Sequence, residues 1–319
     1  MNDGLQIPSG NPVAKFSDPK VTADGEPRAT VALDRLETLW FNTGTLCNIE
    51  CTNCYILSSP TNDDLVYLTL DEFLPYLDEI AERQLGTREI AFTGGEPFMN
   101  PDMCSMARAA LERGFEVLIL TNAMRPMMRA SVKRDLAALG NEFGERLTLR
   151  VSIDHYSAEK HDEQRGQGTF AITLQGMRWL RDTGIRMSAA GRSLWGDNED
   201  ETRQGFAELF ETEDFKIDTN NPAAMVIFPE MDEAAEVPEI TTACWGILDK
   251  SPMDVMCSNA RMVVKRKGAD APAVLACTLL AYDKQFELGQ TLADADRPVA
   301  LNHPHCAKFC VLGGARCSA

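Results

Sequence analysis

Between residues 36 and 230, short apolar runs of strand-like composition alternate with longer segments whose apolar residues recur at helical spacing. The runs typical of strands are 36–41, 89–94, 116–122, 147–154, 185–193 and 223–229. The segments of helical period are 70–84, 101–114, 126–140, 170–184 and 201–214. This strict alternation predicts parallel strands joined by helical crossovers. Six such units suit an incomplete α/β barrel, and a doubly wound open sheet is the alternative.

The two ends of the chain lack this alternation. Residues 1–35 contain four prolines and three glycines and show no period, so we expect an arm over the barrel. After residue 235, two short strand-like runs are joined by a turn at 268–271, and a loop rich in Cys, His and Gly follows. This pattern predicts a small, cysteine-rich extension that contains a β-hairpin. The predicted division is an arm at 1–35, a core barrel at 36–235 and an extension at 236–319.

Charge and hydropathy narrow the class of protein. The chain has no apolar run of 18 residues, and its polar N-terminus lacks the basic and apolar regions of a secretory signal. Its net charge is −17, whereas nucleic-acid binding depends largely on basic residues that neutralise phosphates. Binding to an anionic membrane surface is disfavoured for the same reason. We therefore expect a cytoplasmic protein without nucleic-acid or membrane partners.

Three of the ten cysteines, Cys47, Cys51 and Cys54, lie in a C-x3-C-x2-C loop after the first predicted strand. Clustered thiols in a cytoplasmic chain indicate metal or redox chemistry more often than disulfides. No fourth Cys or His lies nearby to close a zinc site, since the next histidine is His155. Three thiolates on a 4Fe–4S cluster would leave one iron open to a substrate or a second cofactor. A zinc or scaffold site is the alternative interpretation of the loop.

The position and spacing of this loop resemble those of the radical S-adenosylmethionine (radical SAM) enzymes. The run Gly94-Gly95-Glu96-Pro97, after the second predicted strand, is similar to the GGEP motif of that family. The resemblance implies a partial (β/α)6 barrel of the radical SAM type, with SAM bound at the open iron of a 4Fe–4S cluster. It also implies reductive cleavage of SAM to a 5′-deoxyadenosyl radical, which abstracts hydrogen from the substrate. The electron would come from a reductant protein such as flavodoxin or ferredoxin.

The same resemblance assigns residues to SAM. Two glycines let the backbone approach a ligand, and the carboxylate of Glu96 would meet the amino group of SAM. Ser152 and Asp154 are similar to the ribose-binding pair of the family, and Arg192 occupies a place where members often hold the SAM carboxylate. The residues expected to bind SAM are Gly94, Gly95, Glu96, Pro97, Asn122, Ser152, Asp154, Arg165, Arg192 and Tyr55. The chain departs from the family at Asn53, where an aromatic residue commonly precedes the third cysteine; here the aromatic Tyr55 follows it.

A second group of cysteines lies in the predicted extension. Cys257 and Cys277 flank the hairpin, and Cys306, Cys310 and Cys317 follow in a C-x3-C-x6-C run. This arrangement resembles the SPASM and Twitch extensions of radical SAM enzymes. The resemblance implies one auxiliary 4Fe–4S cluster on Cys257, Cys277, Cys306 and Cys310, with Cys317 as an alternative ligand. Such a cluster would assist oxidation of the substrate or formation of a new bond.

Other interpretations of these residues stay open. His303 and His305 are possible substitute ligands, and a structural zinc knot is the alternative for the whole C-terminal group. Cys244 is ambiguous, and Cys104 is expected to be a small buried hydrophobic residue.

Two questions about function also stay open. Relatives that modify ribosomal peptides often carry a leader-binding domain before the barrel. Only about 35 residues precede the first strand here, which favours a small-molecule substrate or a peptide presented by another protein. The alternative function is that of a non-catalytic iron–sulfur carrier, redox sensor or zinc-binding module. Such a protein would not need Glu96 at a strand end.

Overall fold

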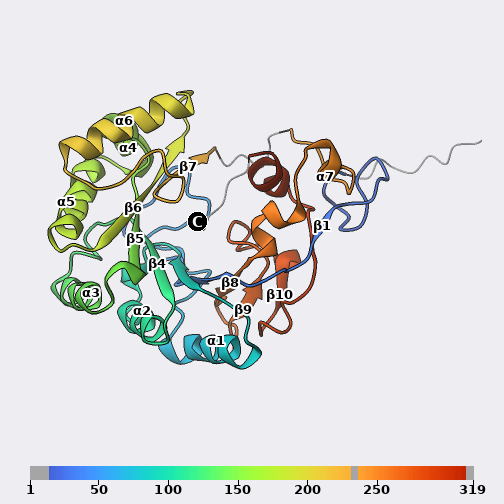
Figure 1. The fold of residues 1–319 in the computed structure, drawn as a ribbon, viewed down its shortest axis with the longest axis horizontal. Helices are drawn as coiled ribbons and strands as arrows, with labels where there is room; N and C mark the ends of the chain where they lie inside the picture. The colour runs from blue at the N-terminus through green and yellow to red at the C-terminus, as the bar shows by residue number, and fades with distance from the viewer. Residues whose placement is uncertain (1–13, 231–235, 314–319) are drawn as a thin grey trace, which may run out of the picture.

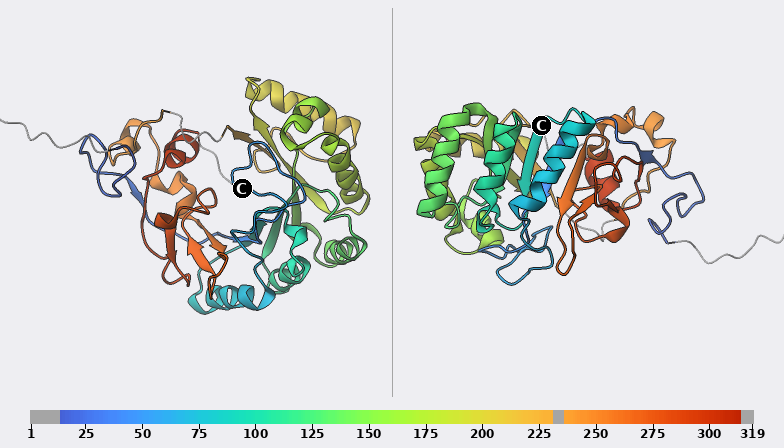
Figure 2. Two further views of the ribbon diagram at one scale, coloured as in Figure 1. Left: turned by 180° about the vertical axis from the view of Figure 1, so that it is seen from behind. Right: turned by 90° about the horizontal axis from the view of Figure 1, so that it is seen from below.

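The computed structural model describes residues 14–230 and 236–313 (Figure 1). One curved sheet of nine strands runs through the molecule in the order β10-β9-β8-β2-β3-β4-β5-β6-β7. The helices α1 to α6 lie along its outer side, and the C-terminal extension, with β8, β9 and β10, forms the end of the sheet opposite β7 (Figures 1 and 2).

Six parallel strands follow one another in chain order and form the core of the sheet. They are β2 (Thr38–Asn42), β3 (Glu89–Thr93), β4 (Glu116–Thr121), β5 (Leu147–Ser152), β6 (Arg186–Ser193) and β7 (Met225–Pro229). The crossover helices are α1 (Leu70–Arg83), α2 (Met103–Glu112), α3 (Ala130–Phe143), α4 (Ala158–Arg165), α5 (Thr169–Asp182) and α6 (Glu199–Thr212). Within the described residues β7 does not pair with β10, so the barrel is open. This architecture confirms the predicted partial (β/α)6 barrel, and it excludes a doubly wound core because the strand order does not reverse from β2 to β7.

Alternation along the strands divides the buried side chains between two layers. On β2, Leu39 and Phe41 belong to the large cluster between the sheet and the helices. The intervening Trp40 belongs to a smaller cluster inside the barrel, together with Leu118 and Met262. Successive residues of a strand point to opposite faces, so one five-residue strand supplies both layers. The helices therefore cover the outside, and the inside is left for a pocket.

The C-terminal extension continues the same sheet. The strands β8 (Ala260–Val264), β9 (Ala273–Leu275) and β10 (Glu287–Gly289) pair antiparallel with one another, which confirms the predicted hairpin. Strand β8 pairs parallel with β2, so the hairpin lies beside the strand that leads into the three-cysteine loop. The extension also contains the short helix α7 (Cys244–Ile247) and the π-helix η6 (Cys306–Leu312).

The expectation that the N-terminal arm lies over the barrel is wrong for its described part. Strand β1 (Thr30–Val31) pairs antiparallel with β11 (Val299–Ala300) of the extension. The buried guanidinium of Arg28 forms an ion pair with Glu239, also in the extension. Backbone pairing and a buried charge pair thus hold the arm on the extension, because both would cost free energy if left unpaired. Residues 1–13 of the arm lie outside the described residues.

Candidate active site

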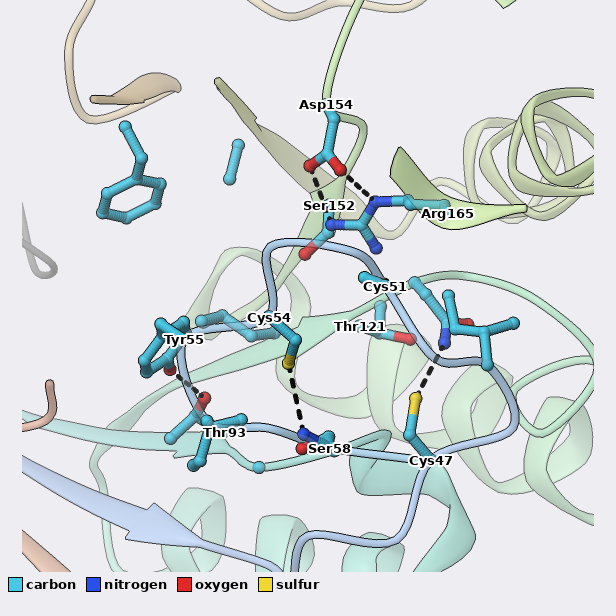
Figure 3. A pocket seen from close by; sticks show the side chains of 18 of the residues that line it. Cys47, Cys51, Cys54, Tyr55, Ser58, Thr93, Thr121, Ser152, Asp154 and Arg165 are labelled. Carbon is cyan, nitrogen blue, oxygen red and sulfur yellow. Dashed lines mark hydrogen bonds and ion pairs between the residues drawn. The ribbon is translucent and has the colours of Figure 1, made fainter. Parts of the chain in front are cut away.

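A pocket opens at the carboxyl ends of the parallel strands, where active sites of α/β barrels are built (Figure 3). It encloses about 1120 Å³ of space, including its opening to solvent. Of the predicted site residues, those that line it are Cys47, Cys51, Cys54, Tyr55, Gly94, Gly95, Asn122, Ser152, Asp154, Arg165 and Arg192. Residues from six different segments of the chain are thus brought to one cavity.

The three-cysteine loop presents its thiols to this pocket (Figure 3). Its start is fixed by the Cys47 amide, which donates to the Ser59 carbonyl at 3.0 Å. The Cys54 thiol accepts a hydrogen bond from the Ser58 amide at 3.3 Å. Among the described residues, no three Cys, His, Asp or Glu side chains are placed to hold a single metal ion.

The electrostatics of the loop shows what a bound group must contribute. Burial raises the pKa of the Cys47 thiol to about 12 and also raises the pKa of Cys51. Thiols bind metals as thiolates. Burial disfavours the thiolate forms of Cys47 and Cys51, so the positive charge of a metal centre would be needed to stabilise them. Three thiols on one pocket wall fit a 4Fe–4S cluster that keeps one iron open.

The two glycines after β3 hold the cysteine loop in place. Two backbone amides donate hydrogen bonds to the loop: Gly95 to the Gly44 carbonyl at 2.8 Å, and Glu96 to the Leu46 carbonyl at 3.1 Å. A Cβ atom on Gly95 would lie 2.2 Å from the Leu46 carbonyl oxygen, which is too close for any side chain. Gly94 adds a φ of +138°, a conformation that favours glycine. The glycines therefore allow the loop to cross directly over the end of β3.

Glu96 does not line the pocket, although it follows these glycines. Its carboxylate is buried and accepts hydrogen bonds from the Thr121 hydroxyl at 2.8 Å, the Asn122 amide at 2.8 Å and the Phe98 amide at 3.3 Å. Burial raises the pKa of Glu96 to about 7, against these hydrogen bonds, which lower it. In this structure the carboxylate thus joins the ends of β3 and β4. Pro97 also lies outside the pocket lining and begins a short 3₁₀ helix, η1 (Pro97–Met99).

Asp154 lies just after β5 and binds two arginines at the pocket wall, of which Arg165 is shown in Figure 3. Both of its oxygens accept hydrogen bonds from Arg165, each at 2.9 Å, and Arg192 lies 3.5 Å away. Burial opposes ionisation of Asp154, but the two guanidinium groups outweigh it and hold the pKa of this carboxyl below its usual range. The arrangement leaves one net positive charge at this wall.

The unexpected Asn53 has a clear role in the structure. Its side-chain amide donates to the Gln164 side chain at 2.9 Å, and its backbone carbonyl accepts a hydrogen bond from the Arg192 guanidinium at 2.6 Å. The adjacent Thr52 amide donates to the Gln164 carbonyl at 2.9 Å. The second half of the cysteine loop is therefore tied to the end of α4. Tyr55 lines the pocket instead, with its hydroxyl 3.4 Å from that of Thr93.

Sequence reasoning missed the rest of the pocket wall. The additional lining side chains away from the cysteine loop include Trp40, Thr93, Leu120, Phe228, Thr278 and Leu279. Most of them are strand residues that look like ordinary core positions in the sequence. Thr278 and Leu279 come from the extension and directly follow Cys277, a link that only the folded structure reveals.

Two of the C-terminal cysteines flank the hairpin: Cys257 precedes β8, and Cys277 follows β9. Cys257 and Cys306 are buried, and the charge of a Cys306 thiolate would interact with those of Cys277 and Cys257. Burial first, and then this repulsion, raises the pKa of Cys306 well above its usual value. Cys310 lies four residues after Cys306 on the π-helix, a rare conformation that is frequent at functional sites. Cys317 lies outside the described residues.

The remaining cysteines and histidines have other surroundings. The Cys244 thiol lies 3.5 Å from the hydroxyl of Thr241. Cys104 is partly buried on α2 and packs against the main core. His303 and His305 stack edge-to-face, with ring centroids 4.8 Å apart, beside the first turn of the π-helix.

The described residues include no helix that is long and apolar enough to cross a membrane.

Comparisons with known proteins agree with this geometry. The family model described as "Radical SAM superfamily" matches residues 41–209. An AdoMet-dependent heme synthase of Methanosarcina barkeri is 34% identical over 139 residues, which cover 42% of this chain and 36% of the relative. The subtilosin biosynthesis protein AlbA of Bacillus subtilis is 28% identical over 154 residues, which cover 47% of this chain and 32% of AlbA. These matches span only about a third of the length of the relatives.

Solved structures share the fold. Streptococcus suis SuiB bound to S-adenosylmethionine aligns with a TM-score of 0.56 at 12% identity, over 79% of this chain and 63% of SuiB. Native anSMEcpe with bound AdoMet aligns with a TM-score of 0.58 at 14% identity, over 86% of this chain and 83% of anSMEcpe. Together with the family match over more than half of its length, this identifies the chain as a member of the radical SAM superfamily.

Proposed function

We propose that this protein cleaves SAM reductively at a 4Fe–4S cluster held by Cys47, Cys51 and Cys54. The observation that supports this most directly is the single pocket shared by the three thiols, the Gly94-Gly95 turn and Ser152. When bound, the cluster and SAM supply a 5′-deoxyadenosyl radical that abstracts a hydrogen atom from the substrate. The protein provides the ligands, fixes their positions and shields the site from solvent.

The pocket residues suggest how SAM is held. Gly94 and Gly95 line the pocket, and their backbone would contact the amino group of SAM, while Glu96 keeps its three hydrogen-bond donors. The net positive charge of the Asp154–Arg165–Arg192 group would attract the SAM carboxylate. The hydroxyl of Ser152 lines the pocket and would bind the ribose. The side chain of Asn122 would contact the methionine portion while it keeps its hydrogen bonds to Asn48 and Met124, each at 3.0 Å.

The composition of the pocket wall favours an uncharged reacting group in the substrate. Among the described lining residues, the only charged side chains are Asp154, Arg165 and Arg192, and they bind one another. The wall away from the cysteines is largely apolar and includes Trp40, Phe228 and Leu279. A triphosphate, as in the substrate named for GTP 3′,8-cyclase relatives, would need further cations.

A peptide side chain meets this requirement, and an apolar small molecule is the alternative. Two of the solved structures with this fold hold peptides: SuiB with the precursor peptide SuiA, and anSMEcpe with a Cp18Cys peptide. A relative named as a subtilosin biosynthesis protein and one named as a mycofactocin maturase match 47% and 44% of this chain in sequence.

We assign an auxiliary 4Fe–4S cluster to the extension, residues 236–319, with Cys257, Cys277, Cys306 and Cys310 as its ligands. The mutual electrostatic interaction of the first three thiols supports a shared site. Cys277 immediately precedes pocket residues, so a cluster bound there would lie close enough to take an electron from a substrate radical. Cys317 stays an alternative ligand, and a reductant protein such as flavodoxin or ferredoxin would supply the electron for SAM cleavage.

The test is formation of 5′-deoxyadenosine by the reconstituted protein with SAM and dithionite under anaerobic conditions. We expect formation in the parent, its loss in Cys51→Ala, and its retention in the matched variant Cys104→Ala, whose thiol packs against the core. Absence of 5′-deoxyadenosine from a parent protein with an intact first cluster would favour the non-catalytic carrier. Bound zinc in place of iron would favour the zinc module.

A further inference from the structure

Arg261 on β8 is a buried charge without a carboxylate partner. Its side chain is 1% exposed. The guanidinium donates to four backbone carbonyls: Cys257 at 2.6 Å, Ala260 at 2.8 Å, Ala295 at 3.1 Å and Arg297 at 3.4 Å. Within residues 14–230 and 236–313, no carboxylate lies at ion-pair distance from it.

This situation is costly and differs from that of comparable arginines. Arginine stays protonated in proteins, and an ion placed in the interior without an opposite charge is strongly destabilising. The buried guanidinium of Arg28 pairs with Glu239, and that of Arg165 pairs with Asp154. Carbonyl dipoles satisfy the hydrogen bonds of Arg261 but do not neutralise its charge. A negative charge is therefore expected nearby when the protein is complete.

The groups that can supply this charge are cysteines. Arg261 interacts electrostatically most strongly with Cys257, then with the exposed Asp296, which forms an ion pair with Arg83, and then with Cys277. Cys306 in turn interacts with the same two thiols. Thiols are neutral, but they become anionic when they bind a metal centre. The uncompensated arginine thus lies beside the cysteine set to which the auxiliary cluster is assigned.

We propose that Arg261 is the fixed counter-charge of the auxiliary 4Fe–4S cluster and raises its reduction potential. The inference rests on the proposed function, since it needs a cluster on Cys257, Cys277 and Cys306. Reduction adds one electron and no proton, so the cluster becomes more negative by one unit. A nearby positive charge stabilises the reduced form more than the oxidised form, and net charge is one of the factors that set cluster potentials.

A raised reduction potential would affect the direction of electron transfer in the reaction. A higher potential makes the auxiliary site a better acceptor for an electron from a substrate radical in the adjoining pocket. Arg261 would thereby favour net oxidation of the substrate. It also ties the turn at Cys257 to residues 295–297, so its effect on charge must be separated from its effect on position.

The experiment uses the full chain with Cys47, Cys51 and Cys54 replaced by alanine, so that one cluster gives the whole signal. The midpoint potential is measured by redox titration monitored by electron paramagnetic resonance. We expect Arg261→Gln to disfavour reduction at least ten-fold, which is a shift of about 59 mV to lower potential for one electron. Arg261→Lys keeps the charge and should stay within a three-fold change. The exposed Arg186→Gln serves as the matched control and should change nothing.

Each outcome of this titration either supports or overturns the role of Arg261 as a counter-charge. An unchanged potential in Arg261→Gln with full iron content overturns the proposal. If Arg261→Gln loses its cluster, Arg261→Lys decides: retention near the parent potential supports a role for the charge, and loss in both variants shows a role in position alone. Absence of iron from the background protein with an intact Arg261 would instead refute the auxiliary cluster itself.

Discussion

Replacing Gly95 by alanine isolates the contribution of the crossing between β3 and the cysteine loop. The backbone of Gly95 is not left-handed, so alanine adds no conformational strain. The only change is a Cβ atom 2.2 Å from the Leu46 carbonyl oxygen, 2.6 Å from its carbon and 2.7 Å from the Thr45 oxygen. All three are backbone atoms, so no flexible side chain can move aside.

The geometry sets the size of the effect. Ordinary van der Waals contact begins at 3.4 Å, so a movement of about 1.2 Å (3.4 − 2.2) between the loop and the end of β3 restores it. Such a movement weakens the hydrogen bonds from Gly95 and Glu96 to the loop and displaces Cys47. Overpacking of this kind costs about 1–3 kcal/mol of stability. A misplacement of about 1 Å at a reacting centre can lower a rate about 100-fold.

The assay is the rate of 5′-deoxyadenosine formation, measured with the melting temperature and iron content of the same preparation. We expect Gly95→Ala to remain folded and to lose about 100-fold in rate. The matched control is Gly246→Ala, where an added Cβ meets no atom within 4 Å. A rate for Gly95→Ala within two-fold of the parent would refute the reasoning that this crossing positions the loop.

Three further predictions concern the polar groups around the pocket. Asp154→Asn leaves the nearly buried Arg165 without its partner and should lower the unfolding free energy by about 3–5 kcal/mol, measured by urea denaturation. Burial raises the pKa of Glu96 from 4.5 to about 7, so the folded protein keeps a proton that the unfolded chain loses in this interval. Stability should therefore fall by about 3 kcal/mol as the pH rises from 4.5 to 7, and a Glu96→Gln variant whose unfolding curve still shows this slope would contradict the assignment. Asn53→Ala removes the side-chain bond to Gln164 and should cost about 1 kcal/mol and speed the loss of iron in air, whereas an unchanged rate of iron loss would show that the bond is dispensable.

The sequence was sufficient for the barrel because its strands and helices carry strong, distinct periods. The strands β2 to β7 lie close to their predicted positions, and the helix α1 begins at Leu70 as predicted, behind a capping box formed by Thr69 and Glu72. The helix α3 begins at Ala130, four residues later than predicted, because residues 125–128 form a turn.

Elements without such a period escaped prediction. The helix α4 is polar on nearly all sides, so no apolar stripe in the sequence predicts it. It nevertheless carries Gln164 and Arg165, which contact the site. The two-residue strands β1 and β11 pair across almost the whole chain, and no local pattern encodes such a contact.

For the candidate site, too, the sequence predicts some features and not others. The cysteine spacing and the strand ends predict which residues meet in one pocket. The partners of each side chain depend on tertiary geometry: the sequence suggests that Glu96 contacts a ligand, whereas the structure shows it bound to Thr121 and Asn122. Arg261 reads as an ordinary strand residue, and its unpaired charge becomes visible only once the burial of β8 is known.

The central claim is that two separate cysteine groups each hold a 4Fe–4S cluster. It is tested most directly by iron and sulfide content per chain after anaerobic reconstitution of the parent and two variants. The account predicts about eight irons in the parent, about four when Cys47, Cys51 and Cys54 are all replaced by alanine, and about four when Cys257 and Cys277 are replaced. About four irons in the parent, with no loss on replacing Cys257 and Cys277, would contradict the second cluster. Retention of all the iron without Cys47, Cys51 and Cys54 would contradict the first.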